Sequence, residues 1–108
     1  MPHIRFRALQ SEHVSTLSKN LVKELASFIK TSEDNFTFEL VQTQFFIQGQ
    51  ATSGYPFVEV LWFERTPEIQ QQVANLITEN IKKLIDTDVA VVFQPLLQKN
   101  YFENGQHF

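Results

Sequence analysis

The chain has 108 residues, enough for one domain with a single core, and 43% of them are hydrophobic, including eleven Phe. A net charge of −3 without a basic cluster argues against a nucleic-acid partner. The absence of cysteine excludes disulfides and thiolate chemistry. No apolar run approaches the ~20 residues that span a bilayer. Without an apolar signal region at the N-terminus, we expect a cytoplasmic protein with no membrane partner.

The first half of the chain predicts a strand, a helix and a second strand. Polar and apolar residues alternate over residues 3–8, as in a strand with two different faces. Apolar residues then recur every three or four positions, predicting a helix over residues 11–30 with Ser11 as its N-cap. Residues 36–47 are expected to form one strand, 36–41 running on through 45–47. The turn-rich segment 49–54 is either a hairpin connection or a mobile flap.

The second half repeats this order. Residues 56–63 predict a strand with a proline at its start, where a missing donor is tolerated. The Thr-Pro-Glu sequence at 66–68 combines cap, proline and acid, as at a helix start, and the apolar stripe runs to Ile85. Residues 86–88 interrupt the stripe, and residues 89–93 predict the last strand.

The two halves are weakly repeated in sequence. Pro2 precedes Pro56 by 54 residues, and both halves read strand, helix, strand. Because a long connection through a helix implies parallel strands, we expect two β-α-β units that form a four-stranded mixed sheet, with both helices on one face. This α+β fold would be one domain over residues 1–108. Its pseudo-repeats span about 2–48 and 55–94, followed by a tail over 95–108.

The alternation also divides the strand residues between the two faces of the sheet. Ile4, Phe6 and Ala8 are assigned to the helix face, and His3, Arg5 and Arg7 to the other face, where Glu39 and Glu59 are also expected. Charges in such positions are costly if they are buried without partners. Either this second face is solvated, or its charges pair, or other subunits cover it. Cross-strand ion pairs are the simplest interpretation; alternatively, Arg5, Arg7 and Glu39 belong to a site for a carboxylate.

Three stretches resemble a known family. They are the opening Met-Pro-His-Ile-Arg-Phe-Arg (1–7), the segment Gly-Tyr-Pro-Phe-Val-Glu-Val-Leu-Trp-Phe (54–63) and the tail Tyr-Phe-Glu-Asn-Gly-Gln-His-Phe (101–108). Together with the duplicated architecture, they resemble the superfamily of macrophage migration inhibitory factor and oxalocrotonate tautomerase. Within it, the likeness is closer to a bacterial family of unknown function.

The resemblance implies a homotrimer whose sheets face the centre, and a chain from which Met1 is removed to leave Pro2 with a free amine. That amine would be a general base acting on a small enol or α-keto carboxylate, without a cofactor. An amine in a desolvated pocket is suited to this role, because burial lowers its pKa. The chain departs from the known pockets at Ala90, Val92 and Glu39, where better-known members carry a tyrosine, an asparagine and an arginine.

The leading hypothesis is therefore a tautomerase-like isomerase. Pro2 is the base, Arg5 or Arg7 anchors the carboxylate, and Glu39 assists proton transfer or positions water. The competing hypothesis is a non-enzymatic oligomer that binds a metabolite or a protein.

The aromatic tail is expected to pack across a subunit boundary, or to close a neighbour's pocket through Tyr101, Phe102 or His107. The spacing of the three histidines does not suit a metal site.

Overall fold

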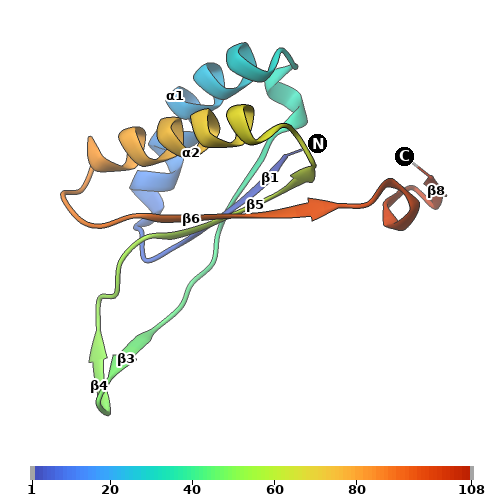
Figure 1. Ribbon diagram of the computed structural model, residues 1–108. Helices are drawn as coiled ribbons and strands as arrows, with labels where there is room; N and C mark the ends of the chain where they lie inside the picture. Colours follow the sequence, from blue (N-terminus) through green and yellow to red (C-terminus); the bar gives the residue numbers. More distant parts are fainter. Residues whose placement is uncertain (1, 108) are drawn as a thin grey trace.

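The computed structural model describes residues 2–107, in which two long helices cover one face of a four-stranded sheet (Figure 1). In chain order the elements are β1 (His3–Arg7), α1 (Ser11–Ile29), η1 (Glu33–Asn35), β2 (Thr37–Leu40), β3 (Phe45–Ile47), β4 (Gln50–Thr52), β5 (Phe57–Phe63), α2 (Pro67–Lys82), β6 (Ala90–Leu96), η2 (Gln98–Asn100), β7 (Phe102–Glu103) and β8 (Gln106–His107). No helix among residues 2–107 is long and apolar enough to cross a bilayer.

The main sheet has the strand order β2-β1-β5-β6. Strand β1 runs parallel to β2 and β5 runs parallel to β6, while the central pair β1 and β5 is antiparallel. Each parallel pair is joined through its own helix, as a crossover requires. The expected mixed sheet built from two β-α-β units is therefore confirmed.

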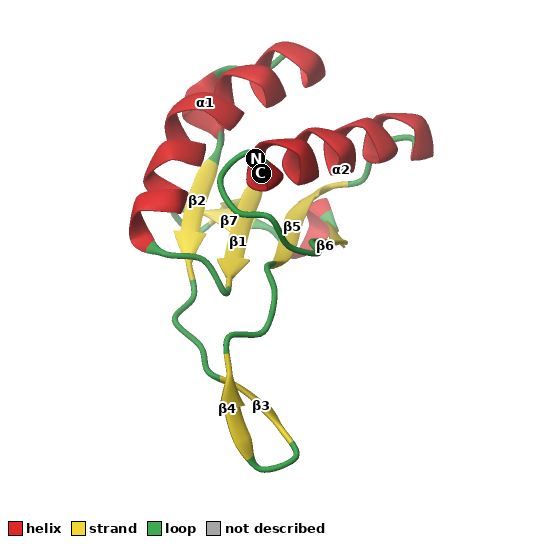
Figure 2. Ribbon diagram, turned by 90° about the vertical axis from the view of Figure 1, so that its left-hand side faces the viewer, coloured by secondary structure: helices red, strands yellow, loops and turns green. Residues whose placement is uncertain are grey.

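The core lies between the sheet and the two helices, which run side by side above it (Figure 2). Its fully buried side chains come from both halves of the chain. They are Ile4 and Phe6 of β1, Leu17, Leu21 and Leu25 of α1, Val58, Val60 and Trp62 of β5, and Ile77 and Ile81 of α2. The Trp62 ring stacks on Phe93 with 4.9 Å between the ring centroids. Alternation along β1 and β5 thus produces one apolar face, as the sequence predicted.

The start of α1 differs from the prediction. Gln10, not Ser11, is the N-cap, and Ser11 is the first helical residue. The Gln10 carbonyl accepts from the backbone N–H groups of His13 and Val14, and the His13 imidazole Nδ1 accepts from the Gln10 N–H at 3.1 Å. The His13 ring thus supplies the reciprocal half of a capping box, in which the N3 side chain accepts from the N–H of the cap residue.

Ala8 also lies elsewhere than predicted. It follows the end of β1 and has a left-handed φ of +64°, so it does not continue the helix-facing row of Ile4 and Phe6. This left-handed residue ends the strand and begins the connection that leads to α1.

Helix α2 begins as predicted and ends three residues earlier. The Thr66 hydroxyl accepts from the Ile69 N–H at 3.3 Å, and Pro67 occupies the first turn. The helix ends at Lys82, and Leu84 and Ile85 follow in a turn while still packing against the core. The apolar stripe therefore extends past the last helical residue.

The strand predicted over residues 36–47 is two separate strands. Strand β2 ends at Leu40, and β3 pairs instead with β4 in a hairpin that projects from the sheet (Figure 1). Gln48 and Gly49, both with positive φ, form its turn. A hairpin is therefore present, but the segment 49–54 is not all connection: the turn is at 48–49, and Gln50–Thr52 form the second strand. The apolar side chains of Phe46 and Ile47 suggested a longer core strand, but they are 63% and 64% exposed and do not pack in the core.

The last strand is longer than predicted. Strand β6 covers Ala90–Leu96 instead of residues 89–93, and it includes Pro95. It lies at the edge of the sheet, where a proline lacking an N–H donor is tolerated. Beyond it, η2 and the small β7–β8 hairpin form a tail that leaves the end of the sheet (Figure 1).

Candidate functional site

Pro2 is buried at the start of β1. Its carbonyl accepts from the Thr37 N–H at 3.1 Å, and this hydrogen bond holds the residue before β1 against the start of β2. A cavity of about 10 Å³, too small for most ligands, adjoins it. The side chains around this cavity are apolar: Ile4, Leu25, Ile29, Phe36, Val60, Trp62 and Val73. The proline is therefore held in a largely dehydrated environment at one end of the sheet.

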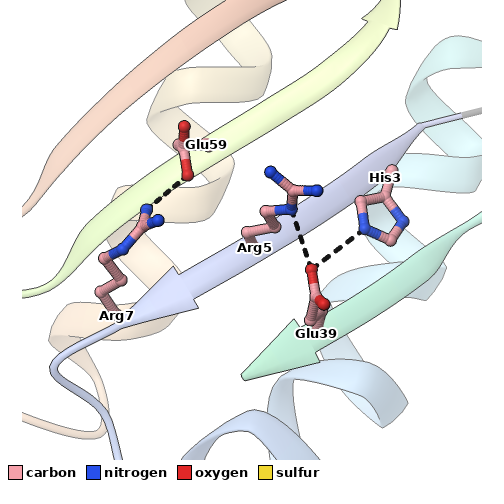
Figure 3. A network of polar contacts seen from close by, with 5 residues as sticks. All are labelled: His3, Arg5, Arg7, Glu39 and Glu59. Atoms are coloured by element: carbon pink, nitrogen blue, oxygen red, sulfur yellow. Dashed lines mark hydrogen bonds and ion pairs between the residues drawn. The ribbon is translucent and has the colours of Figure 1, made fainter. Parts of the chain in front are cut away.

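A polar cluster lies on the sheet face away from the helices, on β1 and its neighbour β2 (Figure 3). Arg5 and Glu39 are partners in the parallel register of β1 and β2, and Arg5 Nε donates to Glu39 Oε1 at 2.9 Å. His3 Nε2 lies 3.2 Å from the same oxygen. All three side chains are between one third and one half exposed.

This environment favours the ionised form of Glu39. The hydrogen bond with His3 is the largest influence that lowers the pKa of Glu39, the interactions with Arg5 lower it further, and partial burial opposes them. The carboxylate is therefore charged at neutral pH and serves as a hydrogen-bond acceptor. Among residues 2–107 the two terminal nitrogens of Arg5 have no partner, so they remain available to a carboxylate ligand.

Arg7 belongs to a different pair. Its Nη1 donates to Glu59 Oε1 on β5, and this pair is less exposed than the pair of Arg5 and Glu39. Figure 3 shows that the two pairs extend to opposite sides of β1. The two arginines that the sequence grouped together are thus separated, with only Arg5 joining His3 and Glu39.

The tail residues lie apart from this cluster. Tyr101 meets Phe63, the last residue of β5, edge-on with 5.4 Å between ring centroids. Phe102 and His107 face each other across the β7–β8 pair, 4.4 Å apart, and both are exposed. Because β1 and β5 are antiparallel, the Phe63 end of β5 is also the Pro2 end of β1. The tail is therefore anchored at the same end of the sheet as the proline.

His3 is the residue that the sequence analysis undervalued. The sequence places it on the second face of the sheet with Arg5 and Arg7 but assigns it no part in the proposed chemistry. No group of three or more His, Cys, Asp or Glu residues within 2–107 is arranged to hold a metal. The available signal was its alternation with Arg5, which places both on one face. Its contact with Glu39 depends on the register between β1 and β2, which the sequence does not specify.

The arrangement combines three chemical capacities within a few residues. A proline nitrogen in dehydrated surroundings, if Met1 were removed, would be an amine able to act as a base near neutral pH. A guanidinium with free terminal nitrogens can bind a carboxylate. An imidazole next to an ionised carboxylate can exchange protons. These are capacities for proton transfer on a small anionic molecule.

Solved structures identify the class of fold. A macrophage migration inhibitory factor-like protein from Entamoeba histolytica superposes with a TM-score of 0.77 at 12% identity, covering 99% of this chain and 98% of that one. A structure described as "F6 fused 4-OT wild type asymmetric trimer" superposes with a TM-score of 0.82 at 14% identity, covering 97% and 94%. The chain thus has the fold of the tautomerase superfamily.

Within that fold, the sequence belongs to the family described as "Domain of unknown function (DUF1904)", which matches residues 1–107. A crystal structure of such a domain from Sebaldella termitidis is 44% identical, covers 100% of both chains and superposes with a TM-score of 0.95. No curated protein matches the chain. The expected fold and the family of unknown function are both confirmed.

Proposed function

We propose that this protein is an enol–keto tautomerase of small carboxylates, in which the free amine of Pro2 is the general base. The observation that carries the proposal is the position of Pro2, which is buried among apolar side chains at the start of the strand that bears His3 and Arg5. Burial disfavours the charged ammonium and so lowers the pKa of the amine toward neutral pH, where it can act as a base. The proposal requires that Met1 is removed.

In this mechanism, Arg5 holds the substrate carboxylate through its terminal nitrogens. Its Nε is already occupied by Glu39, which fixes the orientation of the guanidinium plane before the ligand arrives. Pro2 then removes a proton from the carbon next to the carbonyl group, and returns it in the reverse direction. Glu39, being ionised, repels a second carboxylate, so monocarboxylates are the expected substrates.

The cover over the second face of the sheet is part of the same proposal. We infer that three copies of the chain assemble with their sheets toward a common centre. The fused 4-OT structure, which shares this fold, is described as a trimer, and Leu61, Phe63 and Leu96 of the second face are apolar groups that such an assembly would cover. Light scattering at micromolar concentration tests this, with a mass of three chains expected and a monomer contradicting it.

A binding role is the second candidate, and the small cavity at Pro2 favours it. About 10 Å³ offers no room for a substrate beneath the ring, so a ligand must approach from the polar face or from a subunit boundary. A chain that binds an α-keto acid without converting it would raise the melting temperature in the presence of that acid and leave its tautomer ratio unchanged.

The deciding experiment is the ketonisation of phenylenolpyruvate, followed by ultraviolet absorbance. The protein must carry a free N-terminal proline, confirmed by intact mass. We expect the wild type to be clearly faster than both Pro2→Ala and buffer. Equal rates for all three, with the amine free, would remove the general-base mechanism and leave the binding role.

A further inference from the structure

We propose that His3, oriented by Glu39, is the second acid–base group of this site and exchanges a proton with the substrate oxygen while Pro2 exchanges one with the substrate carbon. This inference rests on the proposed function. Its starting point is the hydrogen bond between His3 Nε2 and Glu39 Oε1, on the strand that begins next to Pro2 (Figure 3).

The hydrogen bond determines which ring nitrogen carries the proton. An ionised carboxylate only accepts hydrogen bonds, so the nitrogen that faces Glu39 must be the one bearing hydrogen. Glu39 is ionised at neutral pH because its pKa is lowered, first by the His3 hydrogen bond and then by Arg5. A neutral His3 is therefore held as the Nε2–H tautomer, and its lone pair lies on Nδ1.

This lone pair is available. Within residues 2–107 Nδ1 of His3 has no hydrogen-bond partner, and the side chain is 33% exposed. The groups around the ring are Arg5 on its own strand, Thr37 and Glu39 on β2, and Leu61, its partner on β5. Arg5 and Glu39 are the charged members of this set, and they are already paired with each other. No described group in this set forms a hydrogen bond with Nδ1, so its lone pair can accept a proton.

The alternative is that His3 serves only to neutralise Glu39. Arg5 already does so, at the shorter distance of 2.9 Å and with a permanent charge. The His3 hydrogen bond also stabilises the carboxylate, as the lowered pKa of Glu39 shows, but this does not exclude a second role. Contact with a carboxylate is the usual way to fix the tautomer of a proton-transferring histidine. The arrangement is thus suited to orienting the ring, with Glu39 as a positioning residue.

The proton transfers balance without a further reactant. In the keto-to-enol direction, the Pro2 nitrogen removes a proton from the α-carbon, the C=C bond forms, and the protonated Nδ1 of His3 gives its proton to the carbonyl oxygen. Ketonisation is the reverse: Nδ1 takes the enol hydroxyl proton and the prolinium N–H protonates the carbon. Consecutive Cα atoms lie about 3.8 Å apart, but consecutive side chains of a strand point to opposite faces. The proposal therefore requires that the substrate reach the backbone nitrogen of Pro2, at the end of the strand, from the face that bears His3.

The tautomer is tested without turnover. Nitrogen-15 NMR of histidine-labelled protein, assigned with His13→Gln and His107→Gln, should give the Nε2–H tautomer for His3 in the wild type. Glu39→Gln should abolish this preference. A wild-type His3 with hydrogen on Nδ1, or a tautomer ratio unaffected by Glu39→Gln, would overturn the orientation by Glu39.

The proton transfer is tested by kinetics with phenylenolpyruvate. His3→Gln keeps a donor for Glu39 but cannot exchange protons, so kcat should fall by at least about tenfold with KM within about twofold. His13→Gln, at the far end of the sheet, is the matched control and should keep wild-type kcat.

The two hypotheses fail in different ways. Wild-type turnover that depends on Pro2 but is unchanged in His3→Gln would overturn the role of His3 alone. If the wild type shows no turnover that depends on Pro2, the proposed function fails, and the catalytic role of His3 fails with it.

Discussion

The two β-α-β halves of the chain share a backbone plan and differ on the second face of the sheet. Pro2 and Pro56 are both buried before a strand, and their carbonyls accept from Thr37 and Ala90 at 3.1 and 3.0 Å. With the same offset of 54, Ile4 and Phe6 correspond to Val58 and Val60, and all four are buried.

The residues on the second face of the sheet do not show the same correspondence between the two halves. His3, Arg5 and Arg7 correspond to Phe57, Glu59 and Leu61, and Glu39 corresponds to Val92 through the two parallel registers. The first half thus carries a polar cluster where the second half is mainly apolar. The difference teaches that the duplicated core sets the geometry of two equivalent proline positions, and that the outer row decides which of them can support chemistry.

The largest expected effect concerns the core. Trp62 is buried and stacks on Phe93, with the Arg65 guanidinium 4.7 Å from its ring, whereas its counterpart in the first half is Ala8. Trp62→Ala should therefore destabilise the fold by about 3–5 kcal/mol, because the large cavity cannot collapse fully. Urea unfolding measures this. If this variant does not fold, the milder Trp62→Phe should still lower the urea midpoint of unfolding. An unchanged midpoint in Trp62→Phe would contradict the packing role of Trp62.

Substitutions at the two prolines should differ more in their effect on catalytic rate than in their effect on stability. Pro2→Ala should lower kcat/KM for phenylenolpyruvate by about 100-fold, because only Pro2 can present a free amine next to an acid–base cluster. Pro56→Ala changes an equally buried proline and should keep the rate within about twofold. Steady-state kinetics on folded variants decides this, and equal losses in both would show that the effect is structural.

The two glutamates should differ in stability. Glu59 is 16% exposed in its side chain and pairs with Arg7, while Glu39 is 45% exposed. Glu59→Gln leaves a half-buried arginine without its counter-charge, and we expect a loss of about 1–3 kcal/mol. Glu39→Gln should cost clearly less, because solvent screens an exposed pair. The free energy of unfolding of both variants gives the comparison, and the reverse order would refute it.

The smallest expected effect is a pH dependence of the stability that the ion pairs of Glu39 provide. Because the pKa of Glu39 is lowered in the folded protein, its ion pairs stabilise the fold fully above the ordinary value of 4.5, and this contribution is lost as the pH falls through the lowered value. The stability difference between the wild type and Glu39→Gln should therefore narrow below about pH 4.5. A difference that is constant from pH 7 to pH 3 would contradict the ionised pair.

Local patterns determined much of this protein. Alternation in residues 3–7 and 57–63 and the helical stripe after Ser11 specified the strands, the first helix and the buried face, because burial on one face leaves a periodic record in the sequence. The Thr66 cap fixed the start of the second helix for a similarly local reason.

Tertiary structure decided what local patterns could not encode. The pairing of β1 between β2 and β5 brought His3 to Glu39 and separated Arg7 from Arg5, and strand order depends on contacts between distant segments. The exposed apolar residues of β3 resembled a continued core strand, because the sequence does not record which partner they pack against. Local patterns were thus enough for the two helices and the core strands β1 and β5, whereas the split at β3, and the grouping of His3 with Arg5 and Glu39, required the assembled sheet.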